Sequence, residues 1–255
     1  MDEAKVLYET RGARALITLN RPRVLNALDL EAYELLWQAL ARFQDDPALR
    51  VAILTGAGTR AFSTGSDLRS IHAGRNAEEA VRVTEGPDRF EIRKPLIAAI
   101  DGYCLAGGLE WALRCDIRIA TPRSSFGLPE PRSGTLSGYA LHHLSRMIPA
   151  GEALYLHLTG ERIDAERALR AGLIQELVAP ELLLHRAEEI AARIIDCAPL
   201  AVEAIKRTVY RNLRRGVDDS YRFVEPIAQE LGRSEDARIG MEAFAAKRKP
   251  EWKGR

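Results

Sequence analysis

Two glutamates in this sequence have a setting that general acid–base chemistry could use. Glu110 follows the glycine pair at 107–108, and Glu130 lies between Pro129 and Pro131, which restrict its backbone. In a water-poor pocket, the pKa values of two carboxyl groups can differ enough for one to act as base and the other as acid. Taken singly, each glutamate is more typical of a surface carboxylate. A catalytic role therefore depends on what the surrounding segments offer.

Two glycine-containing segments follow apolar runs and offer backbone N–H groups. Residues 61–67 (AFSTGSD) come shortly after a run ending at Thr55, and residues 101–110 (DGYCLAGGLE) come directly after a run ending at Ile100. We expect a helix to begin at Gly107, with unpaired N–H groups and the positive end of its dipole pointing outward. One N–H group from each segment would form an oxyanion hole for a thioester or ester carbonyl. The alternative is that both segments are ordinary strand-to-helix turns.

Other common catalytic motifs are absent from the sequence. It contains no P-loop and no GxGxxG, and it lacks the GxSxG elbow of a serine hydrolase. The five histidines form no HExxH motif and no Cys/His set has zinc-ligand spacing, so we expect no catalytic metal. Cys104, Cys115 and Cys197 form no paired motif, and we expect them to be small buried side chains in a reducing compartment.

The composition narrows the class of partner. The 255 residues include 37 basic and 36 acidic side chains, which gives no electrostatic reason to expect nucleic acid or an acidic membrane. No apolar run approaches the ~20 residues that span a bilayer. The first residues lack the layout of a secretory signal. We therefore expect a cytoplasmic globular protein without nucleic-acid or membrane partners.

The elements that must position these residues are strands alternating with helices in the first half of the chain and mostly helices in the second. Apolar runs at 15–19, 51–55 and 96–100 predict strands that are buried on both faces. Between the first two, a stripe of apolar residues predicts a helix over 30–44, with Asp29 as its N-cap. This alternation predicts an α/β fold with a mostly parallel sheet and right-handed crossovers.

Helical patterns dominate beyond about Gly138. We predict helices over 181–195, 200–213, 221–231 and 235–247, and we divide the chain into a core at 1–190 and a helical C-terminal region at 191–255. Several basic residues of the second of these helices are typical of a solvated helix face: Lys206, Arg207, Arg211, Arg214 and Arg215.

Many short segments recur here in an order that resembles one family. They are ITLNRP (17–22), LNAL (25–28), AFSTGSD (61–67), PLIAAIDG (95–102), AGGLE (106–110), DIRIA (116–120), PE (129–130), LTG (158–160), SEDA (234–237) and KRKP (247–250). Together they resemble the crotonase (enoyl-CoA hydratase/isomerase) family over nearly the whole chain. The resemblance implies a spiral of ββα turns, followed by C-terminal helices that build trimers, often paired into hexamers.

The resemblance also implies acyl-CoA thioesters as substrates, with no separate metal or redox cofactor. By position, the backbone N–H groups of Ser66 and Gly107 would form the oxyanion hole. Glu110 and Glu130 match the two hydratase glutamates, and having both favours the addition of water across a 2,3 double bond. The family's CoA site would include a set of residues on the chain and on a neighbouring subunit: Ser63, Thr64, Ser66, Asp67, Leu68 and Gly107, with Phe244 and Lys247 closing over the nucleotide.

One departure from the family pattern lies beside the second glutamate. Hydratases usually continue as Gly-x-x-Pro-Gly-x-Gly-Gly-Thr, whereas residues 134–142 read GTLSGYALH, with Ser137 in place of the proline. Because this segment helps line the family's acyl pocket, it leaves open the acyl group and the roles of Tyr139, His142 and His143. The alternatives are an enoyl-CoA isomerase, a carnitinyl-CoA dehydratase-like enzyme (which residues 249–255 resemble), and a non-catalytic CoA- or RNA-binding member. The lack of a basic, aromatic-interleaved patch disfavours RNA.

Overall fold

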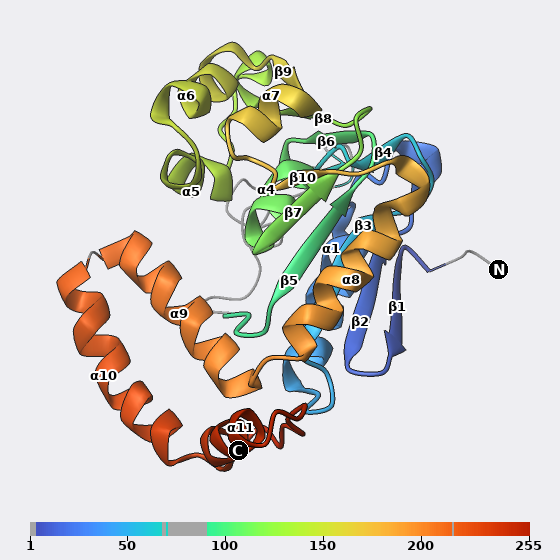
Figure 1. Ribbon diagram of the computed structural model, residues 1–255. Coiled ribbons are helices and arrows are strands. Elements are labelled where there is room, and N and C mark those ends of the chain that lie inside the picture. The colour runs from blue at the N-terminus through green and yellow to red at the C-terminus, as the bar shows by residue number, and fades with distance from the viewer. Residues whose placement is uncertain (1–3, 68–69, 71–90, 216) are drawn as a thin grey trace.

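Two β-sheets form the centre of the molecule in the computed structural model, which describes residues 4–67, 70, 91–215 and 217–255 (Figure 1). The larger sheet has the order β1 (Val6–Arg11), β2 (Arg14–Leu19), β3 (Val51–Gly56), β5 (Leu96–Ile100), β7 (Ile117–Ala120) and β10 (Glu176–Leu177). The smaller sheet has the order β4 (Ala61–Ser63), β6 (Tyr103–Leu105), β8 (Ser125–Gly127) and β9 (Arg162–Asp164). Neighbours run parallel except in the pairs β1–β2 and β8–β9.

The chain alternates between the sheets. β3, β5 and β7 lie in the larger sheet, and each is followed within a few residues by β4, β6 and β8 in the smaller one. Each turn of the spiral thus adds one strand to each sheet, which confirms the predicted α/β fold with parallel strands. The predicted strands at 15–19, 51–55 and 96–100 agree with β2, β3 and β5 to within a residue.

Helices cover both faces of the larger sheet. α1 (Leu30–Asp45) begins at its predicted cap, where the Asp29 carboxylate accepts a hydrogen bond of 2.9 Å from the Ala32 N–H. Ala52 and Leu54 belong to the core beneath α1, while Val51 and Ile53 belong to a second core against α8 (Leu183–Ile195). Alternate residues of β3 therefore bury opposite faces, as the continuous apolar run predicts.

Shorter helices follow the site-bearing strands. They are α4 (Gly107–Arg114), α5 (Tyr139–Met147), α6 (Ala150–Thr159) and α7 (Ala165–Arg170), with 3-10 turns η1 (Pro22–Val24), η2 (Glu130–Ser133) and η3 (Pro180–Leu182). Cys104 and Cys115 are buried as expected. Cys197 is exposed, so that expectation was wrong, because the residue follows the end of α8 on the surface.

The C-terminal region consists of α9 (Pro199–Arg215), α10 (Val217–Arg233) and α11 (Glu235–Ala245), close to the predicted helices. Figure 1 shows α9 and α10 as an arm below the core. Leu183, Ile190 and Ile194 on α8 pack against the larger sheet. Ile205 and Val209 on α9 remain 63% and 52% exposed. The predicted boundary at residue 190 falls within α8, and this division of the chain stays a prediction.

Candidate active site

Three neighbouring strands of the smaller sheet carry the segments of the candidate site at their carboxyl ends. β4 leads to Ser66, β6 leads through Ala106 to Gly107, and β8 leads to Glu130. β4 pairs with β6, and β6 pairs with β8, all in parallel. Because parallel neighbours end at the same edge of a sheet, segments far apart in sequence meet there. The Ala106 N–H donates to the Gly127 carbonyl at 2.9 Å, which joins the second segment to the third.

The segment after β4 is fastened to the LNAL segment. Asn26 is 1% exposed, and its side-chain NH₂ donates to the carbonyls of Ala57 and Ala61 at 3.0 and 2.7 Å. The Ser63 hydroxyl donates to the Asn26 carbonyl at 2.8 Å and accepts the Gly65 N–H at 3.1 Å. Ser63 is therefore turned inward and shapes the loop, and its predicted part in CoA binding stays a prediction.

A parallel β-bridge completes this attachment. The Leu28 N–H donates to the Gly65 carbonyl, and the Asp67 N–H donates to the Leu28 carbonyl, both at 2.8 Å. Ser66 lies between these two bonded residues. Its own N–H is thus held in a fixed direction without being used by the bridge.

The N–H groups of Ser66 and Gly107 are brought together by a close approach of the two loops. A Cβ atom added at Gly65, where φ is +88°, would lie 2.7 Å from the Gly107 nitrogen. One added at Gly107 would lie 3.6 Å from the Ser66 nitrogen. Within the described residues, neither N–H donates a hydrogen bond to the protein. Two adjacent unused donors are what an oxyanion hole requires.

Ala106 sets the direction of the second donor. Its backbone has φ of 50° and ψ of −131°, a conformation that L-residues rarely adopt. It is the N-cap of α4, so the unusual turn separates β6 from the first N–H of the helix. Backbone strain held in place by surrounding structure is typical of functional sites.

A buried tyrosine lies against the same donors. Tyr33 on α1 is 2% exposed, and its hydroxyl lies 2.8 Å from the Ser66 hydroxyl. The same oxygen would be 3.0 Å from a Cβ at Gly107. In the sequence, Tyr33 is one residue of the apolar stripe that predicts the helix at 30–44. The available signal was its hydroxyl, because a buried tyrosine O–H usually needs a partner.

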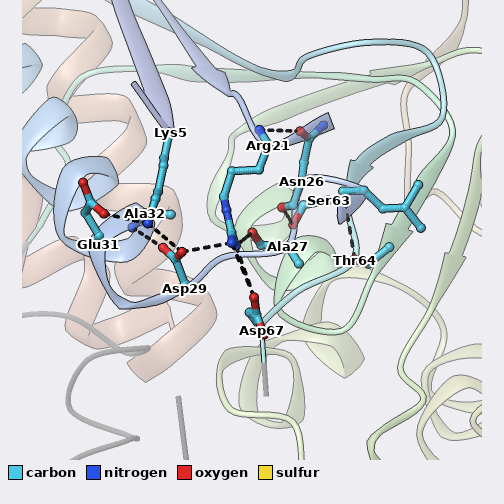
Figure 2. A network of polar contacts seen from close by, with 11 residues as sticks. Lys5, Arg21, Asn26, Ala27, Asp29, Glu31, Ala32, Ser63, Thr64 and Asp67 are labelled. Atoms are coloured by element: carbon cyan, nitrogen blue, oxygen red, sulfur yellow. Dashed lines mark hydrogen bonds and ion pairs between the residues drawn. The ribbon is translucent and has the colours of Figure 1, made fainter. Parts of the chain in front are cut away.

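An ion-pair network supports the outer side of the loop (Figure 2). Arg21 pairs with Asp29 at 2.9 Å and with Asp67 at 3.5 Å, and it also donates to the Ala27 carbonyl. Asp29 additionally pairs with Lys5 at 2.7 Å. Burial alone would raise the pKa of Asp29. The hydrogen bond from Lys5 and the charge of Arg21 outweigh it and hold this pKa below its ordinary value. Asp67 is therefore tied to the cap of α1, and it was predicted only as a CoA contact.

The two glutamates have different surroundings. Glu110 lies on the first turn of α4 and is half-buried, and its Oε1 accepts the Ala140 N–H at 2.9 Å. Glu130 begins η2 and is also half-buried, and its buried Oε2 has no hydrogen-bond partner within the described residues. Burial raises the pKa of Glu130, an effect that a backbone hydrogen bond only partly offsets.

The remaining predicted contacts lie in different parts of the chain. Thr64 belongs to the loop and its N–H donates to the Leu25 carbonyl at 3.2 Å, whereas Leu68 lies outside the described residues. Phe244 on α11 is 87% exposed, and Lys247 follows that helix. Figure 1 shows α11 at the opposite end of the molecule from β4 and β6. A single chain therefore does not bring Phe244 and Lys247 to Ser66.

Comparison with known proteins identifies the family. The family model for enoyl-CoA hydratase/isomerase matches residues 9–255. The chain belongs to this family. It is 37% identical to (E)-benzylidenesuccinyl-CoA hydratase from Thauera aromatica, over 98% of this chain and 99% of that protein. It is 39% identical to carnitinyl-CoA dehydratase from Salmonella arizonae, over 93% of this chain and 94% of that protein.

Solved structures of the family share the fold. The enoyl-CoA hydratase of Mycobacterium marinum superposes with a TM-score of 0.91 at 38% identity, covering 99% of this chain and all of that one. Subunit I of an enoyl-CoA hydratase from Geobacillus kaustophilus gives 0.91 at 33% identity, with 98% of both chains covered. Among the described residues, no helix is long and apolar enough to cross a membrane, and no group of three or more His, Cys, Asp or Glu could hold a metal ion.

Proposed function

We propose that this protein is an enoyl-CoA hydratase, which adds water across the 2,3 double bond of an enoyl-CoA thioester. The observation that carries the proposal is the pair of unused N–H groups at Ser66 and Gly107, in a chain that also retains Glu110 and Glu130. The named relatives support it as well, because a hydratase and a dehydratase run the same reaction in opposite directions.

The proposed mechanism begins at the thioester oxygen. Hydrogen bonds from Ser66 and Gly107 withdraw electrons from the conjugated system, which makes C3 electrophilic and stabilises the enolate that forms. One donor of this kind typically contributes about 3–4 kcal/mol of barrier lowering. Water then adds to C3 while one carboxylate takes its proton, and the other carboxyl group delivers a proton to C2.

We assign the proton donation to Glu130 and the activation of water to Glu110. A carboxyl group with a raised pKa retains its proton to higher pH and is suited to act as an acid. The hydrogen bond from the Ala140 N–H orients the Glu110 carboxylate, which in this assignment takes the proton from water. CoA thioesters enter as substrates, and the mechanism requires no separate cofactor. A cytoplasmic location stays part of the proposal.

The direct test is the loss of the conjugated enoyl-thioester absorbance when the protein is mixed with crotonyl-CoA. We expect turnover, with 3-hydroxybutyryl-CoA as the product by NMR or mass spectrometry. An isomerase would instead convert a 3-enoyl-CoA to its 2-enoyl isomer without taking up water. Tight binding of crotonyl-CoA without any turnover would reject the hydratase and favour a CoA-binding protein.

A further inference from the structure

A basic cavity of about 610 Å³ lies between α9 and the α4–α5 part of the core. Its lining includes six cationic side chains: Arg114, Lys206, Arg207, Arg211, Arg214 and Arg215. Glu91 is the single acidic residue among the described residues that line it. The prediction of a solvated helix face for the α9 residues is therefore incomplete, because these side chains share a cavity whose size suits a small molecule.

Two elements carry residues of both the cavity and the candidate active site. Arg114 lies four residues after Glu110 on α4, and residues at this spacing share one face of a helix. Tyr139 precedes Ala140, the residue whose N–H is bound to Glu110. With a rise of 1.5 Å per residue, Arg114 lies about 10 Å along α4 from Gly107. An acyl chain whose thioester oxygen is held at Gly107 can extend past Glu110 toward this cavity.

Several cations of the cavity are already paired. Lys206 forms an ion pair of 2.8 Å with Asp116, and Arg211 forms one of 2.6 Å with Asp219. Arg207 lies 3.9 Å from Glu91. For Arg214 and Arg215, the described residues provide no carboxylate within ion-pair distance. Within the described part of the chain, Arg214 and Arg215 therefore contribute positive charge to the cavity that no neighbouring carboxylate offsets.

Tyr139 links the arginines from the two sides of the cavity. The Arg114 guanidinium lies 4.1 Å from the centre of the Tyr139 ring, and the positive charges of Arg114 and Arg214 both act on the Tyr139 hydroxyl. Burial raises the pKa of Tyr139, so its hydroxyl stays neutral. Aromatic side chains from α1 and α9, Trp37 and Tyr210, also line the cavity. The walls thus combine apolar surface with orientated guanidinium groups.

We propose that the acyl groups accepted by this protein carry a carboxylate at the end remote from the thioester, and that Arg114 and Arg214 bind it. The proposal rests on the proposed function for the identity of the thioester substrate. Arginine suits this task because its planar fork matches a carboxylate, and it is less strongly hydrated than lysine. The other anions that could reach this cavity are the phosphates of CoA, and the test separates the two sources.

The test compares acyl groups that differ only in the remote carboxylate. Hydration of hex-2-enedioyl-CoA and hex-2-enoyl-CoA is followed as kcat/KM, and binding of adipyl-CoA and hexanoyl-CoA is followed as Kd by calorimetry. We expect the dicarboxylic member to be favoured about 10- to 100-fold in both pairs, in line with a hydrogen-bonded charge pair. A hexenoyl-CoA with a terminal trimethylammonium group should be disfavoured.

Variants test the two arginines. Arg214→Gln and Arg114→Gln should each reduce the preference by about 10-fold, and Arg214→Lys should retain part of it. Arg233→Gln removes the same charge from an exposed position on α10 outside the cavity and should leave the preference unchanged. Thioesters of pantetheine, which lack the nucleotide phosphates, should show the same preference as the CoA thioesters.

The outcomes separate this inference from the proposed function. Hydration of both hexenoyl substrates with equal kcat/KM would overturn the carboxylate site and leave the hydratase intact. Preferential binding of adipyl-CoA without any hydration would support the carboxylate site and reject the hydratase. If the arginine variants weakened adipyl-CoA and hexanoyl-CoA equally and left the pantetheine thioesters unaffected, the cavity would bind CoA phosphate and the proposal would be wrong.

Discussion

Glu130 is partly buried, and its Oε2 has no hydrogen-bond partner among the residues that the structure describes. A carboxyl group in this state costs folding free energy when it ionises, because water cannot solvate the charge. Such a group is retained where a substrate supplies the missing contact. In the proposed mechanism, the contact is the proton transferred to C2.

The first residue-scale prediction concerns the two carboxyl groups. Glu130→Gln and Glu110→Gln should each lower kcat for crotonyl-CoA hydration by at least ~100-fold, since each removes a general acid or base. Binding of butyryl-CoA, measured by calorimetry, should remain close to that of the unmodified protein because the oxyanion donors are unchanged. Near-normal hydration by either variant, with several enoyl chain lengths, would contradict the two-carboxylate mechanism.

The second prediction concerns stability and pH. Because burial raises the pKa of Glu130 above 4.5, its protonation stabilises the folded state at low pH. That contribution is lost as the pH rises through the raised pKa. Glu130→Gln cannot ionise, so its Tm should exceed that of the unmodified protein at about pH 8, and the two should converge at about pH 4.

Calorimetric scans at the two pH values measure this difference. For a chain of this size, each 1 kcal/mol of stabilisation should raise Tm by about 2–4 °C. A gain of equal size at both pH values would mean that buried charge is not its source.

At the scale of elements, the contact between the loop after β4 and the start of α4 is the tightest constraint on the site. Gly65→Ala would place a methyl group 2.7 Å from the Gly107 nitrogen, which must move the donor. We expect kcat to fall by about 100-fold or more, the usual result of losing one oxyanion donor. Steady-state turnover of an enoyl-CoA by the purified variant measures this fall in kcat.

Gly172→Ala is the matched control for this variant. Gly172 also has a positive φ, +76°, but no atom lies within 4 Å of an added Cβ. Both substitutions should cost about 1 kcal/mol of stability through backbone strain, to which Gly65→Ala adds the cost of its clash, and only Gly65→Ala should lose activity. Equal activities for the two variants would show that the Gly65–Gly107 contact does not control the chemistry.

Some of these elements and site residues could be predicted from the sequence, and others could not. The helix at 30–44 was predictable because one apolar stripe repeats along it behind an aspartate cap, and α1 agrees to within a residue. β4, β6 and β8 have three residues each, too few for a period to emerge. Both glutamates and the two glycine-containing segments could be picked out from residue type and spacing, whereas the exact donors Ser66 and Gly107 came from the family resemblance. Tyr33 and Asn26 were missed because their roles exist only after α1 and the loops have packed together.

At the scale of the whole molecule, the exposed face of α9 predicts assembly. Ile205, Val209 and Leu213 repeat every four residues, and all three are exposed in the single chain. An apolar stripe of this kind is usually buried against a partner. We expect a trimer of about 85 kDa from chains of 28.3 kDa. Two such trimers can pair into a hexamer.

Light scattering coupled to size exclusion measures this mass. Val209→Glu together with Ile205→Glu should shift the protein toward the single chain, because the stripe would then carry charge. A fully active species of about 28 kDa for the unmodified protein would contradict both the trimer and a CoA site shared between subunits.

Lys247 lies apart from the candidate active site within its own chain. It follows α11 with a φ of 51°, far from β4 and β6 in its own chain, so it can reach CoA only from a neighbouring subunit. Lys247→Glu should raise KM for crotonyl-CoA by about 10-fold and leave crotonyl-pantetheine almost unchanged, because only CoA carries the nucleotide phosphates. Lys249→Glu, an exposed neighbour paired with Asp196, is the control. Equal effects of Lys247→Glu on both thioesters would rule out the phosphate contact.

The proposed oxyanion donors at Ser66 and Gly107 are main-chain groups, which affects how the protein can change by mutation. Almost any side-chain substitution at these two positions leaves the N–H group itself in place, whereas proline would remove it. The groups that would polarise the thioester therefore depend on the loop geometry and not on side-chain identity. The residues facing the acyl group can vary independently of them. A laboratory evolution experiment confined to Arg114, Tyr139 and Arg214 should therefore yield variants with new acyl preferences that still carry out the same reaction.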